Sequence, residues 1–218
     1  MDHTRHIDIY DLSRESITLI GAGGIGATTA IALAKMGVAS LTVLDMDDVG
    51  TENLATQLHK LSDVGMSKVK AIGATISEYA NDVWVETYKR KIDRYKIQDF
   101  QSKFLICAVD NIKARQEAWA GVSGTKASFF IDARMSAEEF HLYVVDLKDT
   151  AAVERYDKMI WQENDEDVPD LPCTMKATIY TAFMAAGHIC NAVKKLAMGE
   201  KHPFAVIHNI KTFTFLAG

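Results

Sequence analysis

The chain has 218 residues, a formal net charge of −5 and 48% hydrophobic residues, a composition typical of a folded globular domain. The excess of acidic residues argues against a protein whose main task is nucleic-acid binding. No apolar run reaches the roughly 20 residues of a membrane span, and the charged segment 1–6 shows no signal-peptide pattern. Three widely spaced cysteines without a Cys-x-x-Cys pair favour a reducing compartment, so we expect a cytoplasmic protein without structural zinc.

Predicted strands and helices alternate along the chain from residue 16 onward. We expect strands at 16–20, 41–44, 83–87, 104–109, 129–132 and 140–145, helices at 27–36, 66–79, 112–122 and 177–198, and terminal β structure at 205–216. This alternation predicts an α/β fold with a doubly wound, mainly parallel sheet and helices on both faces. We expect one domain over residues 1–218, with an acidic crossover loop at 150–173 and a C-terminal helix and strand at 174–218.

A glycine-rich motif, Gly21-Ala-Gly-Gly-Ile-Gly26, follows the first predicted strand and opens the first predicted helix. Glycine allows the backbone to turn tightly and to approach phosphate oxygens without an intervening Cβ. Free N–H groups and the helix dipole then favour an anion. We therefore expect Gly21, Gly23, Gly24 and Gly26 to hold a nucleotide in a Rossmann-like fold, with a tight turn that binds no ligand as the alternative.

Acidic residues end two of the predicted strands. Asp45 lies at the end of the second strand, where a carboxylate typically binds ribose hydroxyls, which by itself indicates an NAD(P)-binding oxidoreductase. Asp47 and Asp48 crowd the same strand end; this suits a metal-bound triphosphate better than a nicotinamide, although a solvated acidic turn is the alternative. Asp110 ends the fourth strand, so we expect it to face the same crevice as Asp45 unless it caps the next helix.

Five motifs follow one another across residues 16–112: Gly-x-Gly-Gly-x-Gly, Asp45-x-Asp47, Asn53-x-x-x-Gln57, Gly65-x-x-Lys68-Val and Asp110-Asn111. This succession resembles the ThiF/MoeB/HesA family, which includes the ubiquitin-activating enzymes; the chain resembles a compact member without the zinc motif. The resemblance implies ATP- and Mg²⁺-dependent adenylation of the C-terminal glycine of a small ubiquitin-like or sulfur-carrier protein. It also implies a homodimer.

The resemblance assigns a role to each matching residue. The four glycines and Asp45 would hold the adenosine and the phosphates, and Asp110 would bind Mg²⁺. The triphosphate would be oriented by Asp47, Asn53, Gln57 and Lys68. Attack by a carboxylate on the α-phosphate brings two anions together, so such a site must supply positive charge.

Two arginines are candidate site residues at points where the chain departs from the family pattern. Larger relatives usually carry an arginine just before Gln57, where this chain has Thr56. Arg134 follows a predicted strand and is a candidate to replace that charge. Arg5 is a candidate for the arginine that reaches the partner subunit's site in the family; an unremarkable surface position is the alternative.

Cys173 follows the acidic segment and precedes the last long predicted helix. It resembles the crossover-loop cysteine of conjugation-type activating enzymes, whose thiol accepts the activated glycine as a thioester. A helix N-terminus would stabilise its thiolate, whereas an ordinary loop residue is the alternative. Cys107 and Cys190 lie in apolar patterns, so we expect them in the core. Two other function classes stay open: an NAD(P)-binding oxidoreductase and a catalytically silent nucleotide-binding scaffold, the latter favoured by Thr56.

Overall fold

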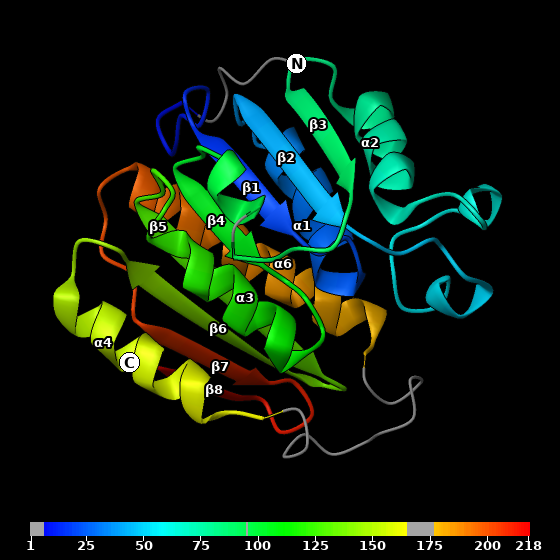
Figure 1. Cartoon of the computed structure of the whole chain (residues 1–218). Coiled ribbons are helices and arrows are strands. Elements are labelled where there is room, and N and C mark those ends of the chain that lie inside the picture. The colour runs from blue at the N-terminus through cyan, green and yellow to red at the C-terminus, as the bar shows by residue number, and fades with distance from the viewer. Residues whose placement is uncertain (1–6, 95, 165–176) are drawn as a thin grey trace.

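The computed structural model describes residues 7–94, 96–164 and 177–218, which form one eight-stranded sheet (Figure 1). Its strand order is β3-β2-β1-β4-β5-β6-β7-β8. The strands are β1 (Ser16–Ile20), β2 (Ser40–Asp45), β3 (Trp84–Lys89), β4 (Phe104–Cys107), β5 (Phe129–Ser136), β6 (Glu139–Asp146), β7 (Ala205–Asn209) and β8 (Thr214–Ala217). The pairs from β3 to β5 are parallel, whereas β6, β7 and β8 add antiparallel pairs. The predicted mainly parallel sheet is confirmed.

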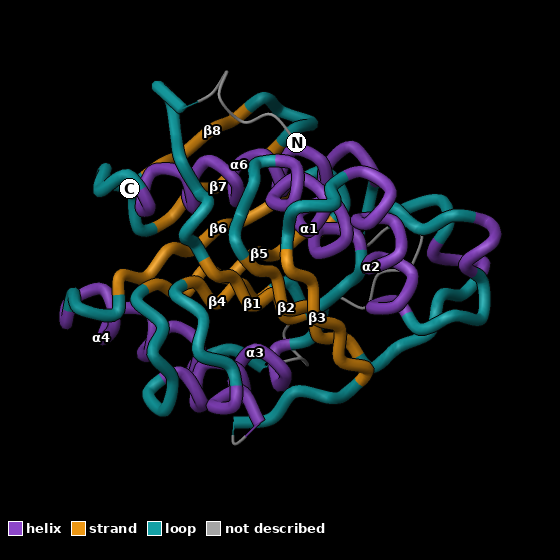
Figure 2. Tube along the Cα trace, turned by 90° about the horizontal axis from the view of Figure 1, so that it is seen from above, coloured by secondary structure: helices purple, strands orange, loops and turns teal. Residues whose placement is uncertain are grey.

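Helices cover both faces of this sheet, as predicted. They are α1 (Gly24–Lys35), α2 (Lys68–Tyr79), α3 (Ile112–Val122), α4 (Thr150–Gln162) and α6 (Ile179–Ala197), with short 3-10 helices η2 (Thr51–Asn53), η3 (Leu61–Asp63) and η4 (Lys96–Asp99). Helices α1, α2 and α6 lie on one face, and α3 and α4 lie on the other (Figure 2). None of the helices in the described part of the chain is long and apolar enough to cross a membrane.

Two apolar cores form because neighbouring side chains of a strand point to opposite faces. In β4, Ile106 belongs to the core beneath α1 and α6, whereas its neighbour Leu105 belongs to the core beneath α3 and α4. Small buried residues such as Ala27 on α1 and Ala185 on α6 allow these two helices to pack closely. The central strands are therefore buried between two layers of helices, whereas the edge strands β3 and β8 are largely exposed.

One sequence prediction is wrong: part of the expected crossover loop at 150–173 is the helix α4. Asp149 caps it, since its Oδ1 accepts hydrogen bonds from two backbone N–H groups of the first turn, at 3.0 and 3.3 Å. Tyr156 and Ile160, four residues apart, are fully buried against the sheet. Two acidic and two basic residues lie on its exposed side, as in an amphipathic helix, and the acidic run that suggested a loop begins only at Glu163. From residue 165 on, the predicted loop lies outside the described residues.

The topology gathers the predicted site at one edge of the sheet. Strand β1 lies between β2 and β4, and all three are parallel, so their carboxyl ends meet at the same edge. Helix α1 leaves β1 on one face, while α3 leaves β4 on the other, so the chain reverses its winding between β1 and β4, the place where open α/β sheets usually bind ligands. The glycine motif, Asp45 and Asp110 follow these three strands in turn.

Candidate functional site

The glycine motif forms a loop that is pressed against the end of β4. Gly21 has φ +101°, and a Cβ placed on it would lie 2.6 Å from the carbonyl oxygen of Ala108. A Cβ on Gly26 would overlap the carbonyl oxygen of Gly21. The N–H of Ala108 donates to the carbonyl of Ile20 at 2.8 Å, which holds β4 close to the loop. Backbone packing therefore requires glycine at both positions, whatever ligand the loop holds.

The N-terminus of α1 points free N–H groups out of this loop. Gly23 is its N-cap, and among the described residues no side chain caps the helix and no acidic residue lies in its first turn. The amide of Gln57 lies against this end, 3.8 Å from the position of a Cβ on Gly23. Its Oε1 is buried and has no hydrogen-bond partner in the described part of the chain. A polar ligand that accepts and donates hydrogen bonds fits these unsatisfied groups.

Asp45 ties the glycine loop to the end of β2. Its Oδ2 accepts a hydrogen bond from the N–H of Ala22 at 2.7 Å, and its Oδ1 accepts one from the N–H of Asp47 at 2.8 Å. Each carboxylate oxygen keeps capacity for another donor, such as a ribose hydroxyl. The side chain thus supports the loop in addition to the role predicted for it.

Lys68 and Asp47 form an ion pair beside the loop. Lys68 is the first residue of α2, and its largely buried side chain places Nζ 3.0 Å from Asp47 Oδ2. Its backbone N–H also donates to the carbonyl of Asp47 at 3.0 Å. Asp48, in contrast, pairs with Lys89 at 2.6 Å. Both carboxylates therefore have a basic partner, and the lysine predicted to reach phosphate is held next to the acidic turn.

Asn53 holds the turn that presents Gln57. Its Oδ1 accepts a hydrogen bond from the N–H of Gly50 at 2.9 Å, and its carbonyl accepts one from the N–H of Gln57 at 2.8 Å. The carbonyl of Thr56, in the same turn, lies 3.2 Å from the position of a Cβ on Gly24. The structure therefore joins Asn53, Thr56 and Gln57 to the glycine loop.

Asp110 lies exposed just beyond β4. The N-cap of α3 is its neighbour Asn111, whose Oδ1 accepts a hydrogen bond from the N–H of Ala114 at 2.8 Å. Helix capping is thus the task of Asn111 and does not explain the carboxylate at 110. The described residues hold no group of three or more His, Cys, Asp or Glu side chains that could bind a metal by themselves. A Mg²⁺ ion at Asp110 would need phosphate oxygens and waters as further ligands, as Mg²⁺ sites usually do.

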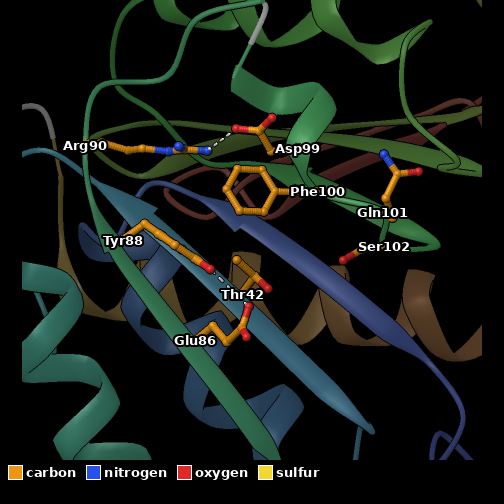
Figure 3. A pocket seen from close by; sticks show the side chains of 8 residues that line it. All are labelled: Thr42, Glu86, Tyr88, Arg90, Asp99, Phe100, Gln101 and Ser102. Atoms are coloured by element: carbon orange, nitrogen blue, oxygen red, sulfur yellow. Dashed lines mark hydrogen bonds and ion pairs between the residues drawn. The ribbon is translucent and has the colours of Figure 1, made fainter.

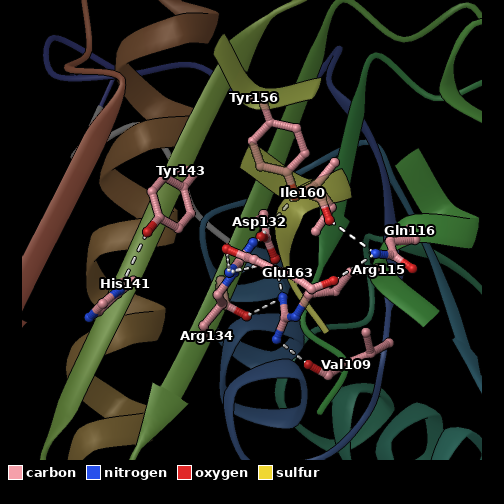
Figure 4. A network of polar contacts seen from close by, with 11 residues as sticks. Val109, Arg115, Gln116, Asp132, Arg134, His141, Tyr143, Tyr156, Ile160 and Glu163 are labelled. Atoms are coloured by element: carbon pink, nitrogen blue, oxygen red, sulfur yellow. Dashed lines mark hydrogen bonds and ion pairs between the residues drawn. The ribbon is translucent and has the colours of Figure 1, made fainter. Parts of the chain in front are cut away.

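Arg134 belongs to a buried network and not to the glycine loop (Figure 4). Its Nε donates to Asp132 at 2.7 Å, and its Nη1 donates to both oxygens of Glu163 at 2.7 Å. Arg115 and Tyr156 also donate to Asp132, which is fully buried. Burial alone would lower the pKa of Arg134, but the charge of Asp132 and the hydrogen bonds to Glu163 outweigh it and raise this pKa.

The direction of the strand explains why Arg134 points away. Met135, the next residue of β5, places its Cε 3.3 Å from the position of a Cβ on Gly24, so it faces α1. Arg134 therefore faces the opposite side, where α3 and α4 lie. One guanidinium atom, Nη2, is buried without a hydrogen-bond partner among the described residues. Arg134 is thus held by two carboxylates. Its predicted role, replacing the positive charge that Thr56 lacks, stays a prediction.

Sequence reasoning missed two residues of this region. His59 is buried, and its Nε2 lies 3.1 Å from the carbonyl oxygen of Ala22 in the glycine loop. Arg115, four residues after Asn111, donates to the carbonyls of Val109 and Ala133 as well as to Asp132. For His59, the available sequence signal was its position two residues after Gln57. No local sequence pattern marked Arg115.

Two cysteines lie in the core, as predicted. Burial raises the pKa of both Cys107 and Cys190 to about 12, so these thiols stay protonated near neutral pH. Cys173 and Arg5, two predicted site residues, lie outside the described residues.

A separate pocket of about 270 Å³ lies over the other part of the sheet (Figure 3). It is lined by Thr42, Glu86, Tyr88, Arg90, Asp99, Phe100, Gln101 and Ser102. Its charged groups are already engaged: Arg90 pairs with Asp99 at 3.3 Å and stacks on Phe100, and Tyr88 donates to Glu86 at 3.3 Å. None of the predicted site residues lines this pocket, so the glycine-loop region is the better candidate site.

Comparison with known families identifies the family of this chain. The sequence profile of the ThiF family matches residues 4–216, nearly the whole chain. The chain belongs to the ThiF family. This membership confirms the predicted resemblance and fits the α/β fold with a glycine loop after β1.

Named relatives share parts of the sequence. Adenylyltransferase and sulfurtransferase MOCS3-1 of Zea mays is 36% identical over 124 residues, which are 52% of this chain and 26% of the relative. The NEDD8-activating enzyme E1 catalytic subunit of Caenorhabditis elegans is 36% identical over 108 residues, 48% of this chain and 25% of the relative. Ubiquitin-like modifier-activating enzyme 5 of Drosophila simulans is 26% identical over 195 residues, 78% of this chain and 48% of the relative. The chain thus spans half or less of the length of these relatives.

Solved structures show the same fold. PaaA superposes with a TM-score of 0.74 at 22% identity, over 95% of this chain and 73% of PaaA. E. coli MccB, in a structure with ATP, gives a TM-score of 0.73 at 15% identity, over 95% of this chain and 64% of MccB. E. coli TcdA, a tRNA N6-threonylcarbamoyladenosine dehydratase in complex with AMP, gives 0.66 at 17% identity, over 86% of this chain and 88% of TcdA.

We expect Gly26→Ala to destabilise the protein by about 3 kcal/mol or more, because the new methyl group would overlap the carbonyl oxygen of Gly21. Gly187→Ala is a matched control within another helix, where no atom lies within 4 Å of the new Cβ. It should be neutral or stabilise by about 0.5–1 kcal/mol. Denaturant unfolding measures both changes, and equal stability of the two variants would contradict the packing argument.

Proposed function

We propose that the chain adenylates the C-terminal glycine carboxylate of a small ubiquitin-like or sulfur-carrier protein, using ATP and Mg²⁺. The observation that carries this proposal is the set of polar groups at the carboxyl ends of β2, β1 and β4. Among the described residues, no side chain caps the N-terminus of α1 and the amide oxygen of Gln57 has no hydrogen-bond partner, while Asp45 ends β2 and Asp110 follows β4. Membership of the ThiF family and relatives named as adenylyltransferases or activating enzymes support it.

Each of these groups suits one part of the nucleotide. The glycine loop and the N-terminus of α1 suit phosphates, since both present backbone N–H groups. Asp45 suits the ribose, and Lys68 suits the β- and γ-phosphates, with Asp47 as its present partner. Asp110 is exposed at the same edge and suits a Mg²⁺ ion, which would neutralise part of the triphosphate charge.

The proposed reaction is one displacement at the α-phosphorus. A carboxylate oxygen of the carrier's terminal glycine forms a bond to this phosphorus. The bond from the α-phosphorus to the oxygen that bridges to the β-phosphate breaks, and pyrophosphate leaves with that electron pair. The chain's residues contribute position and charge: the loop fixes the phosphates, and Lys68 offsets the negative charge of the leaving group.

A catalytically silent nucleotide-binding scaffold is the second candidate, and one observation favours it. Thr56 supplies no charge where relatives carry an arginine, and Arg134, the predicted replacement, is engaged by Asp132 and Glu163. A scaffold would bind nucleotide without forming pyrophosphate. An NAD(P)-dependent oxidoreductase would leave the ion pair of Lys68 with Asp47 without a task, so it is the weaker alternative.

The proposal includes a homodimer in which Arg5 reaches the partner subunit's site. Exposed apolar side chains on α6, those of Tyr180, Phe183 and Met184, support an interface on this helix. Sedimentation as a monomer at assay concentrations would overturn the dimer. The cytoplasmic location stays a prediction from cysteine usage.

We expect exchange of labelled pyrophosphate into ATP that requires both Mg²⁺ and a carrier ending in glycine. Asp110→Ala should lower this exchange at least about a hundredfold, because the phosphates lose their protein-held cation. Binding of AMP without Mg²⁺ should persist in the same variant, since the glycine loop is unchanged. Glu154→Ala, which removes an exposed carboxylate from α4, should retain full exchange.

Two outcomes of these measurements separate the metal assignment from the adenylation activity. Full exchange by Asp110→Ala would remove the metal assignment while leaving adenylation intact. Nucleotide binding by the unaltered protein without any exchange would support the scaffold in place of the enzyme.

A second step, thioester formation on Cys173, is also part of the proposal. The thiolate would attack the acyl carbon of the adenylate, and AMP would leave. Cys173→Ala should therefore keep pyrophosphate exchange but lose a thiol-sensitive adduct with the carrier on non-reducing gels. Cys190→Ala serves as the control, because its buried thiol should not react. An adduct that survives Cys173→Ala would show that the nucleophile is another group.

A further inference from the structure

His59 lies beneath the glycine loop, where no sequence motif placed a histidine. Its side chain is buried, with 8% of the residue exposed. Its Nε2 lies 3.1 Å from the carbonyl oxygen of Ala22. The N–H of Ala22 in turn donates a hydrogen bond to Asp45 Oδ2 at 2.7 Å. Both polar backbone groups of Ala22 are therefore held by side chains, one from the end of β2 and one from the turn after Gln57.

The contact fixes the tautomer of the ring. A carbonyl oxygen can only accept, so Nε2 must carry a proton, and in the neutral ring Nδ1 is then the bare nitrogen. Nδ1 is buried and has no hydrogen-bond partner among the described residues. Burial lowers the pKa of His59, and the charge of Lys68 lowers it further; the carbonyl of Ala22 and the carboxylates of Asp63 and Asp45 oppose this. The ring is thus neutral near pH 7 with its proton on Nε2.

Holding the carbonyl of Ala22 also orients the next N–H group. In a trans peptide, the C=O and N–H of one plane point in opposite directions. The carbonyl of Ala22 shares its plane with the N–H of Gly23, the N-cap of α1. With the carbonyl turned toward His59, this N–H is turned to the other side of the loop. Because Gly23 has no Cβ, steric contacts restrict the orientation of the peptide plane between Ala22 and Gly23 only weakly. A contact from outside the loop is therefore needed to fix this orientation.

We infer that His59 is a positioning residue, which locks the peptide between Ala22 and Gly23 in the orientation that presents the Gly23 N–H to a nucleotide phosphate. This role rests on the proposed function, because it needs a phosphate to be bound at the glycine loop. The contact joins positions 37 residues apart, so it exists only in the folded chain.

The test compares two variants of this residue for binding of ATP and AMP by calorimetry. His59→Leu removes the donor and leaves the carbonyl of Ala22 buried and unsatisfied, so its affinity for ATP should fall about tenfold. His59→Gln places an amide N–H at a similar reach, so it should restore affinity to within about threefold of the unaltered protein. The carrier's KM at saturating ATP should not change in either variant.

His208→Leu is the matched control. The Nδ1 of His208 is also buried without a partner in the described part of the chain, but its ring packs against Phe140 and Phe215, on β6 and β8. This variant should lose stability without losing ATP affinity. A purely structural role for His59 predicts the same pattern for His59→Leu, and that result would overturn the inference. Equal weakening by His59→Leu and His59→Gln would overturn it as well.

Nitrogen NMR of the unaltered protein tests the inference even if His59→Leu does not fold. The imidazole of His59 should carry its proton on Nε2 at pH 7, both with and without nucleotide. A proton on Nδ1 would overturn the role. Failure of the unaltered protein to bind ATP would reject the proposed function itself, whereas tight ATP binding by His59→Leu would reject only the positioning role.

Discussion

The structure depends on the close approach of the glycine loop to the end of β4 and to its own helix. At Gly21 the backbone has φ +101° and leaves no room for a Cβ beside the carbonyl of Ala108; at Gly26 the helix passes against the carbonyl of Gly21. These contacts set the first turn of α1 directly over the carboxyl ends of β1 and β4. A larger residue at either point would push the helix away, and the free N–H groups of α1 would no longer lie over these strand ends. The orientation of the first turn of α1 is thus a consequence of how tightly the sheet and helix pack.

Most of the fold could be predicted from local patterns. The bounds of β1 and α3 match those predicted, because both elements have clear local signals. A short β-rich run before the glycines marks β1, and Asn111 marks the start of α3. The acidic run that begins at Glu163 led to a loop prediction that also covered α4, although Asp149 in front of this helix and the spacing of Tyr156 and Ile160 were signals of a helix. Charged residues indicate that a segment is exposed to solvent, and an exposed segment can be either a loop or one side of a helix.

The site was predictable only where its residues belong to motifs. Asp45 was predicted from its distance to the glycine loop, and Lys68 and Gln57 from the resemblance to the ThiF family; the structure places contacts of each around that loop or beside it. The contact of His59 with Ala22 and that of Arg115 with Asp132 join residues 37 and 17 positions apart. Such pairs depend on the packing of whole elements, and no local pattern reports them. The engagement of Arg134 by Glu163 could not be predicted for the same reason, since its partner comes from the end of a helix that composition had concealed.

The charges at the carboxyl ends of β2, β1 and β4 bear on how a triphosphate could be held there. Asp45, Asp47 and Asp110 bring three negative charges to this edge, and Lys68 brings one positive charge, which Asp47 already offsets. In the buried network, Arg115 and Arg134 are balanced by Asp132 and Glu163, so that network has no positive charge to spare. Under the proposed function, an anion as highly charged as ATP would therefore meet a site that is negative overall. Backbone N–H groups offset only part of this repulsion, since a helix N-terminus carries about half a unit charge. Under the same proposal, a divalent cation that arrives with the nucleotide would offset this negative charge, since Thr56 supplies no positive charge.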